Sequence, residues 1–240
     1  FMIALLGCSE RIILQKDNLP ARFTCPFCYT PNPVVVEAAR GLIRRIDSTP
    51  FLKELFSEGK MLGVLLALDT AEGTVSCLYG FSGLVHGLSH IDGFVPPIFD
   101  TATVDLDSGS AEESRCLQNW LFDQYVVSNA RGEKTTIREI FAARGLVPPG
   151  GTGDCAAPKL MQYAYSHGLK PLAMGEFWYG AAPLREIRRQ VAFYPSCTGK
   201  CGPLLTYMMQ GLEVEPNPLD SDNLWSIEEP VVKFEDEYIV

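Results

Sequence analysis

The chain has 240 residues, of which 47% are hydrophobic and 20% charged, so it can build a core and is not a disordered polymer. Its formal net charge of −9 argues against nucleic-acid binding by the overall charge of the protein. Binding through a local basic patch is still compatible with this composition. The longest apolar run, Met61–Leu68, is far shorter than the roughly 20 residues that a membrane-spanning helix needs.

The first part of the chain predicts two helices followed by a β-hairpin. Pro33 suits a helix start, and the apolar spacing over 34–46 predicts a helix, with a second short one over Pro50–Ser57. Met61–Leu68 and Thr74–Ser82 are apolar runs separated by a polar turn that ends in glycine. Because both runs are apolar over most of their length, we expect this hairpin at the centre of a sheet.

The middle of the chain predicts loops between shorter helices. Gly83–Asp100 is rich in Gly, His and Pro, and Thr101–Ser114 is acidic and small, which predicts a flexible linker or an excursion from the core. Helical spacing over Cys116–Ala130 predicts the next helix. Thr136–Arg144 begins with a capping-box pattern and predicts another.

The last part predicts two more helices around one strand. Cys155–His167, preceded by Asp154 as a cap, predicts a helix, and Pro171–Tyr179 predicts a strand. A further strand is possible over Gln190–Tyr194, and Thr198–Gln210 predicts a helix despite an early proline.

The alternation of apolar strands and amphipathic helices predicts an α/β fold with a central mixed sheet flanked by helices. We expect residues 1–225 to form this region, with one domain over about 20–225 whose sheet includes the hairpin and the strand near 171–179. Residues 226–240 are then expected to be a linker and the first strand, Val231–Val240, of a further domain.

Three cysteines near two predicted helix starts are the most informative feature of the sequence. Cys155 opens one helix, a strand follows, and Cys197 and Cys201 lie at the start of the next helix. Helix N-termini that flank one strand can meet at one sheet edge, and they lower thiol pKa values. The three could therefore ligate Zn²⁺ and leave a fourth position open. The alternative is that they are small buried hydrophobes.

This order resembles the zinc-dependent nucleoside deaminases, in which a hairpin precedes a Cys-x-Glu or His-x-Glu helix, a strand and a Pro-Cys-x-x-Cys helix. The resemblance implies a deaminase-like three-layer sandwich and a zinc enzyme acting on a nucleobase-like substrate. Two departures weigh against that activity. Ala157 stands where the family has its proton-carrying glutamate, and Cys197 and Cys201 have one residue too many between them. Glu176 is a conceivable substitute.

Cys25-Pro-Phe-Cys28 is a second cysteine motif, of the C-x-x-C type. No second pair lies at zinc-ribbon spacing, so these cysteines either complete a distant metal site or belong to an apolar loop with Phe23 and Phe27. The chain start lacks the basic segment of a secretory signal, so we expect a cytoplasmic protein with reduced thiols.

His86, His90 and Asp92 lie in one glycine-rich loop. They could act as ligands or general bases, and the alternative is that they form an ordered loop wall.

A local basic cluster interrupts the acidic composition. Its members could meet RNA phosphates, and otherwise they form a solvated face. Exposure of Trp178 or Tyr179 beside them would favour RNA, because bases stack on aromatic rings. The candidates are Lys170, Arg185, Arg188, Arg189 and Lys200, with Lys159 in a nearby segment.

Most of the chain resembles the N-terminal extension found on a subgroup of RluA-type RNA pseudouridine synthases. The most specific stretches are Gly153–Ala164 and Phe193–Pro203, and Val231–Val240 resembles the first strand of that family's catalytic domain. The resemblance extends over Phe23–Pro33, Gly80–Asp100, Leu117–Phe141, Gly151–Pro183 and Phe193–Leu219.

This resemblance implies a non-catalytic accessory region of an enzyme that isomerises uridine to pseudouridine in structured RNA (rRNA or tRNA). The family's nucleophile is the aspartate of a His-Arg-Leu-Asp motif, which the sequence lacks, and Asp69 follows Ala67-Leu68 in a hairpin turn. No residue here therefore inherits a catalytic role, and no cofactor is required. The implied partners are RNA and the protein's own C-terminal catalytic domain, with no membrane. A purely protein-interacting domain is the alternative that the net charge favours.

Overall fold

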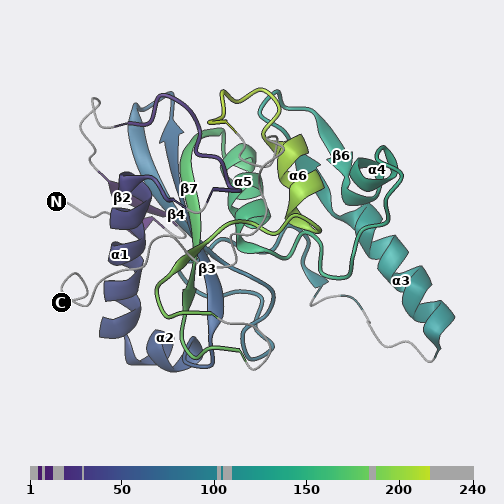
Figure 1. The fold of residues 1–240 in the computed structure, drawn as a ribbon, viewed down its shortest axis with the longest axis horizontal. Helices are drawn as coiled ribbons and strands as arrows, with labels where there is room; N and C mark the ends of the chain where they lie inside the picture. Colours follow the sequence, from purple (N-terminus) through teal and green to yellow (C-terminus); the bar gives the residue numbers. More distant parts are fainter. Residues whose placement is uncertain are drawn as a thin grey trace.

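The computed structural model describes residues 5–6, 9–12, 19–28, 30–101, 104, 110–183 and 188–216. Its centre is a six-stranded sheet with the strand order β1-β2-β4-β3-β7-β8 (Figure 1). These strands are β1 (Leu5–Leu6), β2 (Ser9–Ile12), β3 (Lys60–Asp69), β4 (Thr74–Phe81), β7 (Leu169–Tyr179) and β8 (Phe193–Tyr194). A separate two-stranded sheet pairs β5 (Val126–Ser128) with β6 (Lys134–Thr136).

The predicted hairpin is confirmed at the centre of the sheet. Strands β3 and β4 pair in register from Leu62↔Phe81 to Asp69↔Thr74. The side chain of Asp69 closes the turn, because its Oδ1 accepts hydrogen bonds from the backbone N–H groups of Ala71 and Glu72. Both strands are buried over most of their length, which explains why their sequences are apolar rather than alternating.

The expectation of a mixed sheet was wrong, because every pairing in the described part of this sheet is antiparallel. Strand β7 pairs with β3 on the side opposite β4. The helix-linked strands β4 and β7 thus run in the same direction, but β3 lies between them and is antiparallel to both. β8 returns beside β7 as a second antiparallel neighbour. Strands β1 and β2 were not predicted.

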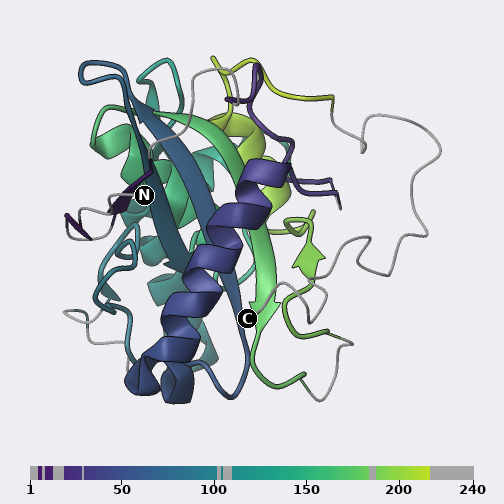
Figure 2. The ribbon, with the colours of Figure 1, turned by 90° about the vertical axis from the view of Figure 1, so that its left-hand side faces the viewer.

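Helices cover both faces of the sheet. α1 and α2 lie on one side, where α1 crosses the sheet and packs on β3 and β7 (Figure 2). α5 lies on the other face and contacts β3, β4 and β7, with α6 beside it (Figure 1). The helices are α1 (Pro33–Ser48), α2 (Pro50–Leu55), α3 (Ala111–Gln124), α4 (Ile137–Ala142), α5 (Ala156–Ser166) and α6 (Cys201–Met208).

A cross-strand pair of glycines lets α5 approach the sheet closely. Gly63 and Gly80 face each other in the β3–β4 register, and Gly63 also pairs with Glu176 of β7. A Cβ atom at Gly63 would lie 2.8 Å from Leu160 Cδ1, and one at Gly80 would lie 3.0 Å from Leu160 Cγ. The first turns of α5 therefore lie directly over this row, beside Glu176.

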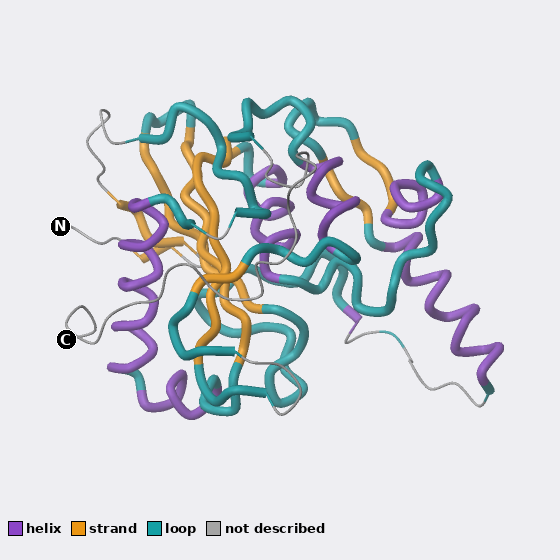
Figure 3. Tube along the Cα trace, viewed as in Figure 1, coloured by secondary structure: helices purple, strands orange, loops and turns teal. Residues whose placement is uncertain are grey.

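Two predicted helices have different boundaries in the structure. α3 begins at Ala111, inside the segment predicted to be a linker, because Ser110 caps it by accepting a hydrogen bond from Glu113 N. It ends at Gln124, and β5 follows where helix was expected. α6 begins at Cys201 rather than Thr198, so Thr198–Lys200 belongs to the segment before the helix. Figure 3 shows how helices, strands and loops alternate along the chain. The predicted capping box of α4 is confirmed.

Candidate metal centre

The three cysteines singled out from the sequence meet at one point. The sulfur atoms of Cys155, Cys197 and Cys201 all lie within 4.8 Å of one another. Cys155 is the N-cap of α5, Cys201 is the first residue of α6, and Cys197 lies in the loop before α6. Cys201 is buried, Cys155 half-buried and Cys197 exposed. The predicted convergence is therefore confirmed, although Cys197 does not itself lie in a helix.

The spacing of the three sulfurs suits a tetrahedral zinc ion. Zn–S bonds are about 2.3 Å long, so two of them at a tetrahedral angle place their sulfurs about 3.8 Å apart, and movements of up to about 1 Å close the site. Soft thiolate ligands select Zn²⁺ over hard cations such as Mg²⁺. Among the residues that the structure describes, no fourth His, Cys, Asp or Glu joins the group. The arrangement could hold a metal ion with three protein ligands and one exchangeable position.

Hydrogen bonds distribute charge unequally among the three thiols. The pKa of Cys197 is lowered, because the thiols of Cys155 and Cys201 donate to its sulfur and the backbone N–H groups of Lys200 and Cys201 also point at it. The pKa values of Cys155 and Cys201 are raised by the same arrangement and by burial. Cys197 is therefore the first of the three thiols to ionise as the pH rises.

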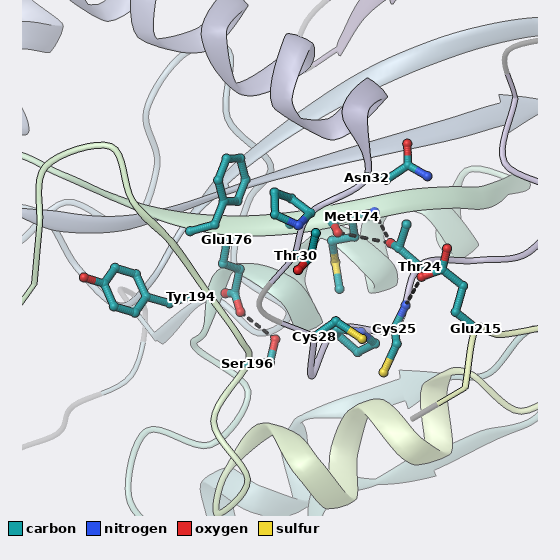
Figure 4. Close-up of a pocket in the computed structure, with 14 residues that line it drawn as sticks. Thr24, Cys25, Cys28, Thr30, Asn32, Met174, Glu176, Tyr194, Ser196 and Glu215 are labelled. Atoms are coloured by element: carbon teal, nitrogen blue, oxygen red, sulfur yellow. Dashed lines mark hydrogen bonds between the residues drawn. The ribbon is translucent and has the colours of Figure 1, made fainter. Parts of the chain in front are cut away.

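Glu176 connects the two segments that carry the cysteines. Its Oε1 accepts a hydrogen bond of 3.2 Å from the backbone N–H of Ala157, in the first turn of α5. Its Oε2 accepts one of 2.6 Å from the hydroxyl of Ser196, which precedes Cys197 (Figure 4). Burial raises the pKa of the carboxyl group, and the two hydrogen bonds oppose that rise. One side chain on β7 thus fixes both sides of the cluster.

Lys159 lies one helical turn after Cys155 and is only 2% exposed. Its Nζ lies 4.3 Å from the centre of the Phe81 ring, and burial lowers its pKa to about 8. The expectation that Lys159 belongs to a basic surface was therefore wrong.

Next to Cys155, the carboxylate of Asp154 accepts a hydrogen bond of 2.7 Å from the Tyr125 hydroxyl, a contact that sequence analysis did not find.

The glycine-rich loop does not form a second metal group. His86, His90 and Asp92 are all exposed. His86 has a positive φ of 48° in the tight turn between Val85 and Leu88. His90 and Asp92 line a surface hollow with Arg45, whose guanidinium donates to the Asp92 carbonyl.

The predicted basic cluster is divided between two ends of β7. Lys170 pairs with Leu68 at the start of the strand, whereas Glu176 pairs with Tyr194 near its other end, about 20 Å away at 3.3 Å per residue. The guanidinium of Arg188 lies 4.3 Å from the centre of the Tyr194 ring.

Two further members of the set lie among the described residues. Arg189 donates its backbone N–H to the Tyr194 hydroxyl, Lys200 is the N-cap of α6, and Arg185 lies outside the described residues. Tyr179 is buried and Trp178 half-buried, so neither ring is a fully exposed stacking surface of the kind that would favour RNA.

A scan of protein-family models gives no match, and searches of curated proteins and of solved structures give no significant match. No helix within the described ranges combines the length and apolar character needed to cross a bilayer. Function is therefore inferred from the site itself.

Proposed function

We propose that this chain binds one zinc ion through Cys155, Cys197 and Cys201. The observation that carries the proposal is the mutual approach of the three sulfur atoms to within 4.8 Å, from two segments separated by strand β7. The surrounding hydrogen bonds support the proposal, because Glu176 holds both segments in place through a backbone N–H and a hydroxyl group. The three thiols are therefore not needed for these contacts and can bind the metal. When bound, zinc would supply a Lewis acid with one exchangeable position beside exposed Cys197.

We further propose that this centre supports the fold rather than a deamination reaction. The strand order β4-β3-β7, with α5 between β4 and β7, is compatible with a deaminase-like sandwich. Ala157, however, offers only a backbone N–H at the position where a deaminase needs its proton-carrying glutamate. Glu176 is engaged by hydrogen bonds at both of its oxygens. A structural metal centre is the assignment that these contacts favour.

Metal analysis of the chain purified without added metal tests this assignment. We expect one zinc ion per chain in the parent protein and its loss in Cys155→Ser and Cys201→Ser. Cys116→Ser is the matched control, because Cys116 is an exposed cysteine outside the cluster. Absence of zinc from the parent protein, even after incubation with excess Zn²⁺ under reducing conditions, would contradict the proposal.

We also propose that the zinc-binding region serves as the accessory part of an RNA pseudouridine synthase. The two stretches with the most specific resemblance, Gly153–Ala164 and Phe193–Pro203, are the ones that meet at the cluster and contribute its three cysteines. In this setting the region assists RNA selection or the organisation of the catalytic domain. Ultraviolet crosslinking of RNA to a chain that includes that domain separates these roles. Crosslinked peptides near Arg188 support RNA selection, and crosslinks confined to the catalytic domain support a protein-organising role.

A further inference from the structure

We propose that Cys25 and Cys28 form a redox-active thiol pair, separate from the metal centre, that closes into an intramolecular disulfide on reaction with a low-molecular-weight disulfide such as glutathione disulfide. Both cysteines are free thiols in the structure. The pair lies on the same side of the sheet as the metal centre but is not part of the group of three sulfurs.

The backbone between the two cysteines brings their thiols together. Pro26 and Phe27 form a turn, and the N–H of Cys28 donates a hydrogen bond of 3.2 Å to the carbonyl of Cys25. Residues at the two ends of a β-turn have Cα atoms less than about 7 Å apart, close to the roughly 4.4–6.8 Å range of disulfides. The two thiols already contact each other through a side-chain hydrogen bond. Little backbone movement is therefore needed to form the S–S bond.

The surroundings hold this turn in place from two sides. The carboxylate of Glu215 accepts a hydrogen bond of 3.2 Å from the N–H of Cys25. The carbonyl of Pro26 accepts one of 2.8 Å from the N–H of Ser196, so the turn lies one hydrogen bond away from the loop that carries Cys197. These contacts keep the two sulfurs side by side.

Accessibility assigns different roles to the two thiols. Cys25 is 4% exposed, whereas Cys28 is half-buried, and both line a pocket that Glu176, Ser196 and Glu215 share (Figure 4). An incoming disulfide therefore meets Cys28 first. The Cys28 thiolate attacks one glutathione sulfur, forms a mixed disulfide and releases one glutathione thiolate. The Cys25 thiolate then attacks the Cys28 sulfur and releases the second glutathione.

In the net reaction the protein dithiol is oxidised, one glutathione disulfide is reduced to two glutathione molecules, and the two thiol protons pass to the products. Burial raises the pKa of Cys25 to about 12, and burial also raises that of Cys28. The reduced form therefore gains no stabilisation from a low-pKa thiolate, in contrast to strongly oxidising dithiols. This favours a disulfide that persists once it has formed.

Cysteine mapping by mass spectrometry tests the pair in the full 240-residue chain. The reduced protein is incubated with glutathione disulfide, alkylated and digested, and each cysteine peptide is identified. We expect the peptide that contains Cys25 and Cys28 to lose both alkylatable thiols and to carry an internal disulfide without glutathione. Exposed Cys116 is the internal control and should carry a glutathione adduct. Because each peptide is identified separately, the result does not depend on whether the metal centre is occupied.

In Cys25→Ser the second step is blocked, so Cys28 should retain one glutathione. If that variant does not fold, the map of the parent protein still decides the question. Alkylation of both Cys25 and Cys28 after Cys116 has reacted would overturn the proposal. So would a second zinc ion per chain that disappears in the double variant Cys25→Ser/Cys28→Ser, because the pair would then be a metal site.

Discussion

The hydroxyl of Ser196 lies 2.6 Å from Oε2 of Glu176 and donates a hydrogen bond to it inside the protein. The other oxygen of the same carboxyl group accepts from Ala157 N, two residues after Cys155. Glu176 reaches both because it pairs with Gly63 in the row of the sheet that α5 covers. The relative positions of Cys155 and Cys197 are thus set by the protein before a metal ion binds.

Replacement of Glu176 by leucine should weaken both the fold and the metal site. Two buried donors would lose their acceptor, at about 1–3 kcal/mol each, so we expect the free energy of unfolding of the metal-free protein to fall by roughly 2–6 kcal/mol. Loss of a group that orients ligands typically lowers metal affinity about 10–100-fold. Urea unfolding and competition with a zinc chelator measure the two effects.

Glu176→Gln should recover part of both losses, because its amide can still accept one hydrogen bond and donate another. Glu58→Leu is the control, since Glu58 is exposed. Zinc binding in Glu176→Leu as tight as in the control would show that Glu176 does not position the ligands.

Zinc affinity should rise steeply with pH. Metal binding requires three thiolates, and hydrogen bonds and burial raise the pKa values of Cys155 and Cys201, whereas hydrogen bonds lower the pKa of Cys197. Binding should therefore release about two protons, which corresponds to an affinity gain of about 100-fold per pH unit between roughly pH 6 and 8. Calorimetry in buffers of different ionisation enthalpy measures the proton count. Release of three protons would show that Cys197 is not a thiolate in the metal-free protein.

The cysteine cluster could be predicted from the sequence, because the positions of its cysteines relative to predicted helices and a strand can be read from short segments of the chain. Cys155, Cys197 and Cys201 lie near helix starts that flank one strand, and strands end at sheet edges. The contact between Glu176 and Ser196 could not be predicted, because it depends on the register of β7 against β3, set by residues more than 100 positions apart. The antiparallel sheet was missed for the same reason.

The burial of Lys159 was also missed, because a lysine is normally expected at the surface, whereas here the ring of Phe81 on strand β4 lies against its Nζ. The start of α3 was missed because the acidic composition of its first turn was taken as a sign of a linker. In fact Ser110 followed by Glu113 is a helix cap.

Lys159→Met should stabilise the metal-free protein at pH 7. The folded-state pKa of Lys159 is about 8, below the ordinary value of 10.5, because burial disfavours the ammonium form. Between pH 8 and pH 10.5 the unfolded chain binds more protons at this lysine than the folded protein does, so this group makes the free energy of unfolding rise with pH. Below pH 8 the full cost of burying the ammonium group applies. The shift corresponds to a cost of about 3 kcal/mol at most, and we expect a gain of roughly 1–3 kcal/mol in the variant.

That gain should shrink toward zero as the pH approaches 10, and urea unfolding of both proteins at several pH values tests this. Lys53→Met, at an exposed position, should change stability little at any pH. A variant that is less stable than the parent protein at pH 7 would mean that the ammonium group is favourably paired in the fold.

The 240-residue chain should not convert uridine to pseudouridine in any RNA. The reaction needs a positioned aspartate nucleophile and a pocket for a flipped base. Asp69 is instead engaged by two backbone N–H groups in the β3–β4 turn. Mass spectrometric nucleoside analysis after incubation with RNA measures the product, and detectable pseudouridine would contradict the accessory role.

X-ray absorption at the zinc edge tests the central claim most directly. If Cys155, Cys197 and Cys201 are the protein ligands, the spectrum of the zinc-loaded chain should show three sulfur atoms at about 2.3 Å and one lighter atom at about 2.0–2.2 Å. Cys116→Ser should give the same spectrum, whereas Cys155→Ser should lose one sulfur or the metal altogether. A first shell of only nitrogen and oxygen atoms, or one of four sulfurs, would contradict the account of a three-cysteine site with an open fourth position.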